Sequence, residues 1–141
     1  MEITKELKQD LSELESACHK FLGKYESQLA DALNRAEMTA EESLKIDLML
    51  ELVTHLSSAQ FISSYMQKDI VKEGLLLMDE AGNFTLEGTP VPPMSDIEVY
   101  VHDDELDQDV WKRVFVSGGE KRICGLRHPD LTSGIHARIR G

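Results

Sequence analysis

Apolar residues recur at steps of three and four along the first half of the chain, the spacing of one face of a helix. The first series predicts a helix over about residues 7–32, and the second predicts a helix that begins after Thr39 and stops at Gly74. Thr39 and Glu42 have the spacing of a capping box. The two series are Leu7, Leu11, Leu14, Cys18, Phe21, Tyr25, Leu29, Ala32 and Leu44, Leu48, Leu52, Leu56, Ala59, Ile62, Met66, Ile70.

The second helix is apolar over more than one face, because Ile46, Met49 and Leu50 lie outside its main series. Two helices joined by a short polar linker favour an antiparallel hairpin within one chain. The extra face needs a further neighbour, either the C-terminal part or a second copy in a four-helix arrangement. A homodimer through the helices therefore stays open.

After Gly74 the period changes to two, which is typical of strands. Residues 75–78 and 84–86 flank a turn and predict a β-hairpin, whereas Pro90, Pro92 and Pro93 predict a loop. Further strands are expected at 97–101, 111–116, 121–126 and 135–139. The chain is thus expected to be α+β, with a helical hairpin at 1–74 and a small antiparallel β-sheet or partly open barrel at 75–141.

The composition indicates an acidic protein, and the sequence also bears on the compartment in which we expect it. The 141 residues carry a formal charge of -11, which disfavours global affinity for nucleic acid. Cys18 and Cys124 have no framework spacing and are expected to be free thiols. Because the N-terminus is charged and no apolar run could span a bilayer, we expect a cytoplasmic protein without membrane insertion.

Residues 82–140 resemble a domain-of-unknown-function family of short bacterial proteins that are common on plasmids, phages and other mobile elements. The similarity is carried by Gly82-Asn83-Phe84, Ile97-Glu98-Val99-Tyr100, Trp111, Arg113-Val114 and the ending from Leu131 to Ile139. The insert from Asp103 to Asp109 replaces a shorter connection in the family. The resemblance brings no activity or catalytic residues, and it implies a mobile-element accessory or counter-defence protein, for example one of the anti-CRISPR kind.

Candidate metal and catalytic sites do not match known patterns. The insert 103–109 has five carboxylates, but a calcium loop that begins at Asp103 would need Gly at Gln108 and Glu at Val114. Residues that zinc could use lack zinc spacing: Cys124, His128, His102 and His136. We expect no metal, no cofactor and no catalysis; a hydrolytic enzyme would need His, Cys and a carboxylate to converge.

Charge is segregated along the C-terminal part. Residues 75–111 contain ten carboxylates and no Lys or Arg, whereas residues 112–141 carry a net charge of +5. The leading interpretation is a protein-binding inhibitor whose carboxylates imitate a nucleic-acid backbone and engage a basic, nucleic-acid-handling bacterial protein or nuclease complex. Its predicted surface comprises Asp96, Glu98, Asp103, Asp104, Glu105, Asp107 and Asp109.

Two other interpretations use the same charges. The basic strands could bind nucleic acid directly, with Tyr100 or Trp111 available for stacking. The cations proposed for this role are Arg113, Lys121, Arg122, Arg138 and Arg140. Alternatively, Glu98 or Asp96 could pair with Arg138 or Arg113 across neighbouring strands and only stabilise the sheet.

Overall fold

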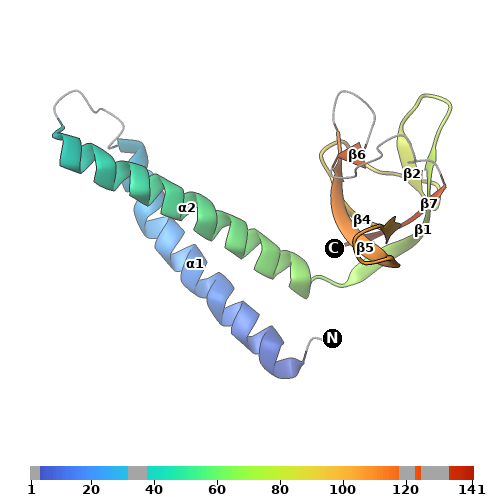
Figure 1. The fold of residues 1–141 in the computed structure, drawn as a ribbon, viewed down its shortest axis with the longest axis horizontal. Coiled ribbons are helices and arrows are strands. Elements are labelled where there is room, and N and C mark those ends of the chain that lie inside the picture. The colour runs from blue at the N-terminus through green and yellow to red at the C-terminus, as the bar shows by residue number, and fades with distance from the viewer. Residues whose placement is uncertain (1–3, 32–37, 118–122, 125–133) are drawn as a thin grey trace. The chain divides into compact units, whose positions relative to one another are not determined.

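The computed structural model describes residues 4–31, 38–117, 123–124 and 134–141 (Figure 1). They fall into two compact units, a helical unit (Met1–Lys68) and a β unit (Asp69–Gly141). The first holds two helices and the second an antiparallel sheet that is not closed. The predicted α+β fold, with a helical hairpin before a small antiparallel sheet, is confirmed.

The two helices are α1 (Lys5–Asp31) and α2 (Ala40–Gln67). The predicted capping box is present at the start of α2. The Glu42 amide donates to the Thr39 hydroxyl oxygen at 3.2 Å, and the Thr39 amide donates to the Glu42 carboxylate at 2.8 Å. Two of the amides that a helix start leaves without partners are thereby satisfied.

Packing between the helices buries Cys18, Leu22 and Leu29 of α1. Polar contacts fix the pairing: the Ser63 hydroxyl donates to the Leu11 carbonyl at 2.8 Å, and the Gln67 amide group donates to the Glu15 carboxylate at 3.0 Å. Ser63 is itself buried, so its hydroxyl needs this partner. Cys18 is a free thiol, as predicted, whereas the side chain of Cys124 lies outside the described residues.

In its N-terminal half, the face of α2 that packs on α1 differs from the predicted one. Leu44, Leu48 and Leu52 of the predicted series are exposed, whereas Met49 and Val53, outside that series, are partly covered. Later members of the series, Leu56, Ala59 and Met66, are partly covered as predicted. The covered positions continue at helical spacing to Ser63, which contacts α1. Because α2 is apolar around most of its circumference, residue spacing alone does not identify the packed face.

The predicted end of the second helix at Gly74 is wrong. The helix stops at Gln67, Lys68 is extended with φ -72° and ψ 140°, and strand β1 (Ile70–Met78) follows. Gly74 lies within β1 opposite Ala137, so it is not a helix stop. Pairing with a strand more than 60 residues away along the chain overrides the local three-four spacing, and the units divide after Lys68 rather than after Gly74.

The described strands form one antiparallel sheet in the order β3-β2-β1-β7-β4-β5-β6. Their bounds after β1 are β2 (Phe84–Leu86), β3 (Thr89–Pro90), β4 (Asp96–Asp103), β5 (Gln108–Val116), β6 (Ile123–Cys124) and β7 (Ile135–Arg140). The predicted hairpin is confirmed, with Met78 opposite Phe84. The stretch with Pro90 is not entirely a loop, because Thr89–Pro90 pairs with β2 at the sheet edge, a position that tolerates proline.

One face of the sheet carries the core of the β unit. Alternate residues of β4, among them Ile97 and Val99, are fully buried, as their period of two predicts. The buried cluster consists of Leu76, Phe84, Leu86, Val91, Ile97, Val99, Val114, Val116 and Ala137. Residues on the opposite face carry the polar and aromatic side chains considered next.

Candidate interaction surfaces of the β unit

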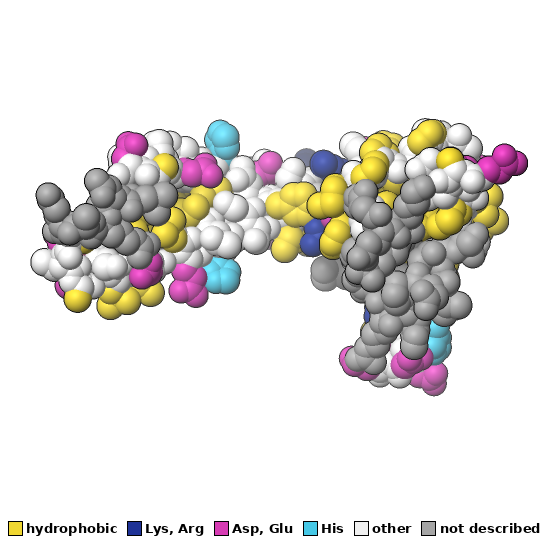
Figure 2. Space-filling model, turned by 90° about the horizontal axis from the view of Figure 1, so that it is seen from above, with side chains coloured by type: hydrophobic (Ala, Val, Ile, Leu, Met, Phe, Trp, Pro, Cys, Tyr) yellow, Lys and Arg dark blue, Asp and Glu magenta, His cyan; other side chains and the backbone are white. Residues whose placement is uncertain are grey.

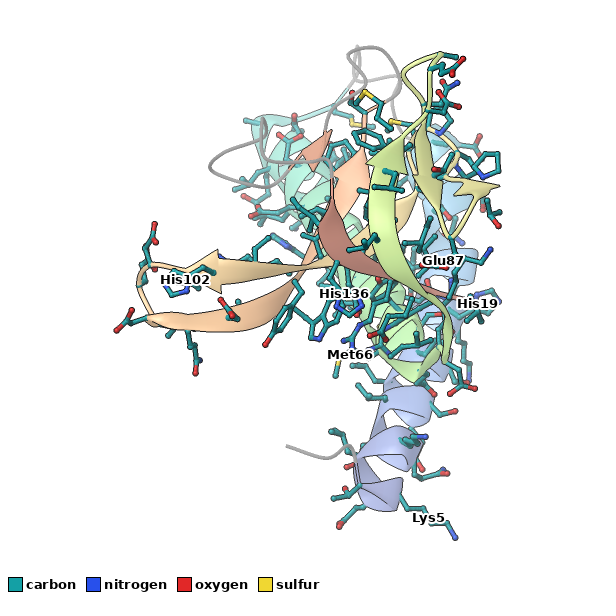
Figure 3. All side chains as sticks on the ribbon, turned by 90° about the vertical axis from the view of Figure 1, so that its right-hand side faces the viewer. Lys5, His19, Met66, Glu87, His102 and His136 are labelled. Atoms are coloured by element: carbon teal, nitrogen blue, oxygen red, sulfur yellow. The ribbon has the colours of Figure 1, made fainter. Side chains whose placement is uncertain are left out.

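The hairpin of β4 and β5 extends past the rest of the sheet. Strand β7 pairs with β4 only at Glu98 and Val99, and β6 pairs with β5 only at Phe115 and Val116. Residues 100–111, which we call the arm, therefore pair only with one another among the described strands. Figure 3 shows this two-stranded arm, marked by His102, projecting from the sheet that holds His136.

Asp103 holds the end of the arm together. Its carboxylate accepts hydrogen bonds from the amides of Glu105 and Leu106 at 2.9 and 3.2 Å, and it lies 2.6 Å from the Lys112 ammonium nitrogen. The hydrogen bond from Lys112, together with the two amides, holds the pKa of Asp103 below its usual value. Asp103 is therefore committed to the turn rather than available to a partner.

Four further carboxylates are exposed at the end of the arm. These arm carboxylates are Asp104, Glu105, Asp107 and Asp109. The side chain of Asp107 is 99% exposed, and that of Asp109 is 56% exposed. Their recorded ion pairs are with His102, at 3.7 and 3.2 Å, and an imidazole offsets a carboxylate charge only when it is protonated. Figure 2 shows acidic side chains gathered beside a histidine at this end of the β unit.

The other two predicted acidic residues lie at the base of the arm in contact with arginines. The Asp96 carboxylate is 3.3 Å from the Arg113 guanidinium. The Glu98 carboxylate accepts a hydrogen bond from the Arg138 guanidinium through one oxygen and, at 2.7 Å, from that of Arg140 through the other. Glu98 is only 8% exposed.

Burial raises the pKa of Glu98, but the hydrogen bonds and charges of Arg140 and Arg138 outweigh it, and the pKa lies below its usual value. Glu98 is thus a buried, ionised carboxylate that joins β4 to β7. The interpretation that acidic and basic side chains pair across the strands is confirmed for Glu98 and for Asp96. Of the seven predicted acidic residues, the four arm carboxylates remain as an outward surface.

A cluster of aromatic side chains lies beside one of these arginines. The Trp111 ring lies 5.2 Å from that of Tyr100 and 5.4 Å from the His136 imidazole, measured between centroids. Arg138 stacks on Trp111. Pairing of β4 with β5 and β7 brings these residues together; His136 was not predicted in this cluster, because only the strand order shows that it neighbours Trp111.

The basic surface is only partly described. Arg113, Arg138 and Arg140 each contact a carboxylate, whereas Lys121 and Arg122 lie outside the described residues.

The residues considered for zinc are dispersed where they are described. His102 contacts Asp107 and Asp109, whereas His136 contacts Glu73 at 3.3 Å. His128 and the side chain of Cys124 fall outside the described part of the chain. Within that part, no three His, Cys, Asp or Glu side chains are arranged to hold a metal ion.

Neither described helix is both long enough and apolar enough to cross a membrane. Comparison of the chain with protein-family models, with curated proteins and with solved structures finds no match, so the similarity of residues 82–140 to a mobile-element family stays a prediction.

Proposed function

We propose that this protein acts without catalysis, by binding a basic, nucleic-acid-handling bacterial protein through the four arm carboxylates. The observation that carries the proposal is the arm itself, a two-stranded projection whose end bears Asp104, Glu105, Asp107 and Asp109. A narrow projection can enter a groove that is shaped for a nucleic-acid strand. Carboxylates at its end meet the cations that otherwise bind phosphate, and such complementarity governs both partner choice and the rate of encounter.

The acidic residues have different structural roles, and this difference supports the proposal. Asp96, Glu98 and Asp103 hold the base and the turn of the arm, and their charges are offset by Arg113, Arg138, Arg140 and Lys112. Among the described residues, Asp107 and Asp109 form their ion pairs with His102. The charges of Asp107 and Asp109 are therefore offset only when His102 is protonated, whereas charge at the base of the arm is used internally. The resemblance to mobile-element proteins makes a counter-defence inhibitor the type of accessory protein proposed.

The test compares two variants of equal charge. The first changes the arm carboxylates to amides (Asp104→Asn, Glu105→Gln, Asp107→Asn, Asp109→Asn) and keeps Asp103, which the turn requires. The control changes four exposed carboxylates of α1 (Glu6→Gln, Asp10→Asn, Glu13→Gln, Glu26→Gln). Both variants and the unmodified chain are used as bait in bacterial lysate, and captured proteins are identified by mass spectrometry.

We expect the unmodified chain and the control to capture the same basic nucleic-acid-binding protein, and added DNA or RNA to displace it. The arm variant should lose this partner. Capture that is equal with both variants, or that nucleic acid does not displace, contradicts the proposal.

A second candidate function is direct binding of nucleic acid, which is favoured by the stacking of Arg138 on Trp111 beside Tyr100. Aromatic rings with neighbouring cations bind single-stranded bases. Against it, the Arg138 and Arg140 guanidinium groups already contact Glu98. An electrophoretic shift assay at low salt separates the candidates: the second requires binding that weakens with added salt and on Trp111→Ala substitution.

A further inference from the structure

An apolar stripe on α2 is left uncovered within the helical unit. Leu44, Leu48, Leu52 and Ile62 are 52%, 55%, 42% and 48% exposed. The first three follow at steps of four, and Ile62 lies eighteen residues after Leu44, which is five turns of a helix with about 3.6 residues per turn. All four side chains therefore lie along one side of α2. Figure 2 shows hydrophobic side chains open at the surface of the helical unit.

This stripe is separate from the side of α2 that packs on α1. Ser63, whose hydroxyl contacts the Leu11 carbonyl, marks the packed side. Ile62 is its neighbour in sequence and so points about 100° away around the helix, whereas Leu52 lies at the edge of the stripe nearest to α1, about 20° from Ser63. A helix that is apolar on two sides is typical of a position between two other elements. Among the described residues of the helical unit, only one of these elements, α1, is present.

Charge along α2 indicates what covers the stripe. Residues 52–67 contain no Asp, Glu, Lys or Arg, whereas the N-terminal part of the helix carries Glu41, Glu42, Asp47 and Glu51 against Lys45. If two copies of α2 pair in parallel, the acidic ends lie side by side and repel. If they pair antiparallel, each acidic end lies beside the uncharged end of the other helix.

The stripe also matches itself in size when α2 is paired antiparallel. With the two-fold axis at residue 53, Leu44 lies beside Ile62 of the second copy. In this register the position opposite the large Leu48 is one residue, about 1.5 Å along the helix, from the small Ala59, and the position opposite Leu52 is one residue from His55. A surface that contacts itself through a two-fold axis must be complementary to itself, and this pattern meets that condition.

We propose that two copies of the chain associate through this stripe, with their α2 helices antiparallel and the four helices forming a bundle. Two helical hairpins that share an apolar seam form such bundles. An interface that is uncharged over most of its length suits a second copy better than the basic partner proposed for the arm. The proposed dimer contact does not use residues of the arm, so the two proposals are tested separately.

The first test measures the mass of the full chain by light scattering coupled to size-exclusion chromatography. The wild-type chain should have twice the monomer mass of 15.9 kDa. Leu48→Glu should give the monomer mass, because two buried carboxylates would face the partner helix. The matched control is Leu75→Glu in β1, since Leu75 is 51% exposed and lies outside the helical unit; this variant should stay a dimer.

Circular dichroism checks that the helices of Leu48→Glu persist. If they do not, Leu48→Ala replaces this variant and should raise the dimer dissociation constant by at least about tenfold. A wild-type chain that is monomeric at every concentration measured overturns the proposal, as does a dimer that neither Leu48 variant weakens.

The second test determines direction by cross-linking. The double variant Leu44→Cys with Ile62→Cys cannot close a disulfide within one helix, because eighteen residues span about 27 Å. On oxidation, an antiparallel pair should link position 44 of one copy to position 62 of the other, as identified by peptide mass spectrometry. Links of 44 to 44 and 62 to 62 show a parallel pair and overturn the antiparallel arrangement. The chain with only its native Cys18 and Cys124 gives the background.

Discussion

The Arg138 guanidinium carbon lies 4.0 Å from the centroid of the Trp111 ring. The same guanidinium donates to the buried Glu98 carboxylate, so one side chain joins strand β7 to both strands of the hairpin that forms the arm. Stacking and a charge-assisted hydrogen bond reinforce each other here, because the ring covers the cation while the carboxylate fixes its plane. This contact anchors the base of the arm on the sheet.

Replacement of Arg138 by lysine should therefore destabilise the β unit although the charge is kept. An ammonium lacks the planar face that stacks on Trp111, and we expect a loss of about 1 kcal/mol in the free energy of unfolding. Trp111 is the only tryptophan in the chain, so denaturant unfolding followed by its fluorescence reports on this site. Arg113→Lys is the control, because that exposed pair with Asp96 contributes less. An equal loss in both variants would show that the stacking contributes nothing.

The buried Glu98 predicts a pH dependence of stability. Because its pKa is lower in the folded chain than the ordinary value of 4.5, the ionised carboxylate stabilises the fold above that pH. This contribution should disappear as the pH falls below about 4.5 through the folded-state pKa. Glu98→Gln should cost roughly 3 kcal/mol near pH 7, since it leaves Arg138 and Arg140 without their carboxylate.

The measurement is the free energy of unfolding, from Trp111 fluorescence, at matched pH values above and below 4.5. The difference in the free energy of unfolding between the wild-type chain and Glu98→Gln should become smaller at pH values below 4.5. Glu26→Gln, which removes an exposed carboxylate of α1, serves as the control for loss of charge and should show no such difference. A difference that is constant with pH would mean that Glu98 contributes by packing rather than by its charge.

Local features of the fold could be predicted from the sequence. The capping box needs only Thr39 and Glu42, three residues apart, and the alternation of Ile97, Val99 and Val101 is set by the geometry of a single strand. These features depend on neighbours along the chain. The pattern therefore identified the start of α2 and the buried face of β4 without knowledge of the remaining strands.

Features that depend on distant residues could not be predicted in this way. The segment from Ile70 to Gly74 continues the helical spacing, yet it pairs with β7. The alternation in β4 predicts an exposed Glu98, but Arg138 and Arg140 cover it from β7. Charge counting points to the hairpin of β4 and β5, whereas only the contacts between strands separate the arm carboxylates from those used internally.

The cap of α2 gives a prediction for the helical unit. Thr39→Ala should lower its stability by about 1 kcal/mol, because the Glu42 amide loses its hydroxyl partner. Thermal unfolding followed by the helical circular dichroism signal measures this loss. The control is Thr54→Ala in the middle of α2, where the hydroxyl donates to the Leu50 carbonyl and alanine favours the helix more than threonine does. A loss in Thr54→Ala equal to that in Thr39→Ala would argue against a specific cap.

The turn of the arm gives a prediction about local order. Asp103→Ala removes the acceptor of the Glu105 and Leu106 amides and the partner of Lys112, so exchange of these two amides with deuterium should become faster. The core strands should be unaffected, because the arm pairs only with itself.

In the wild-type chain the protection of the Glu105 and Leu106 amides should also weaken as the pH falls below 3.8, the ordinary pKa of an aspartate, since the pKa of Asp103 lies lower in the folded chain. Amide exchange, corrected for its intrinsic dependence on pH, measures both effects. Asp104→Ala is the matched control because no hydrogen bond of the turn uses its side chain among those described, and exchange in that variant should match the wild type. Unchanged protection in Asp103→Ala would show that the turn is held by strand pairing alone.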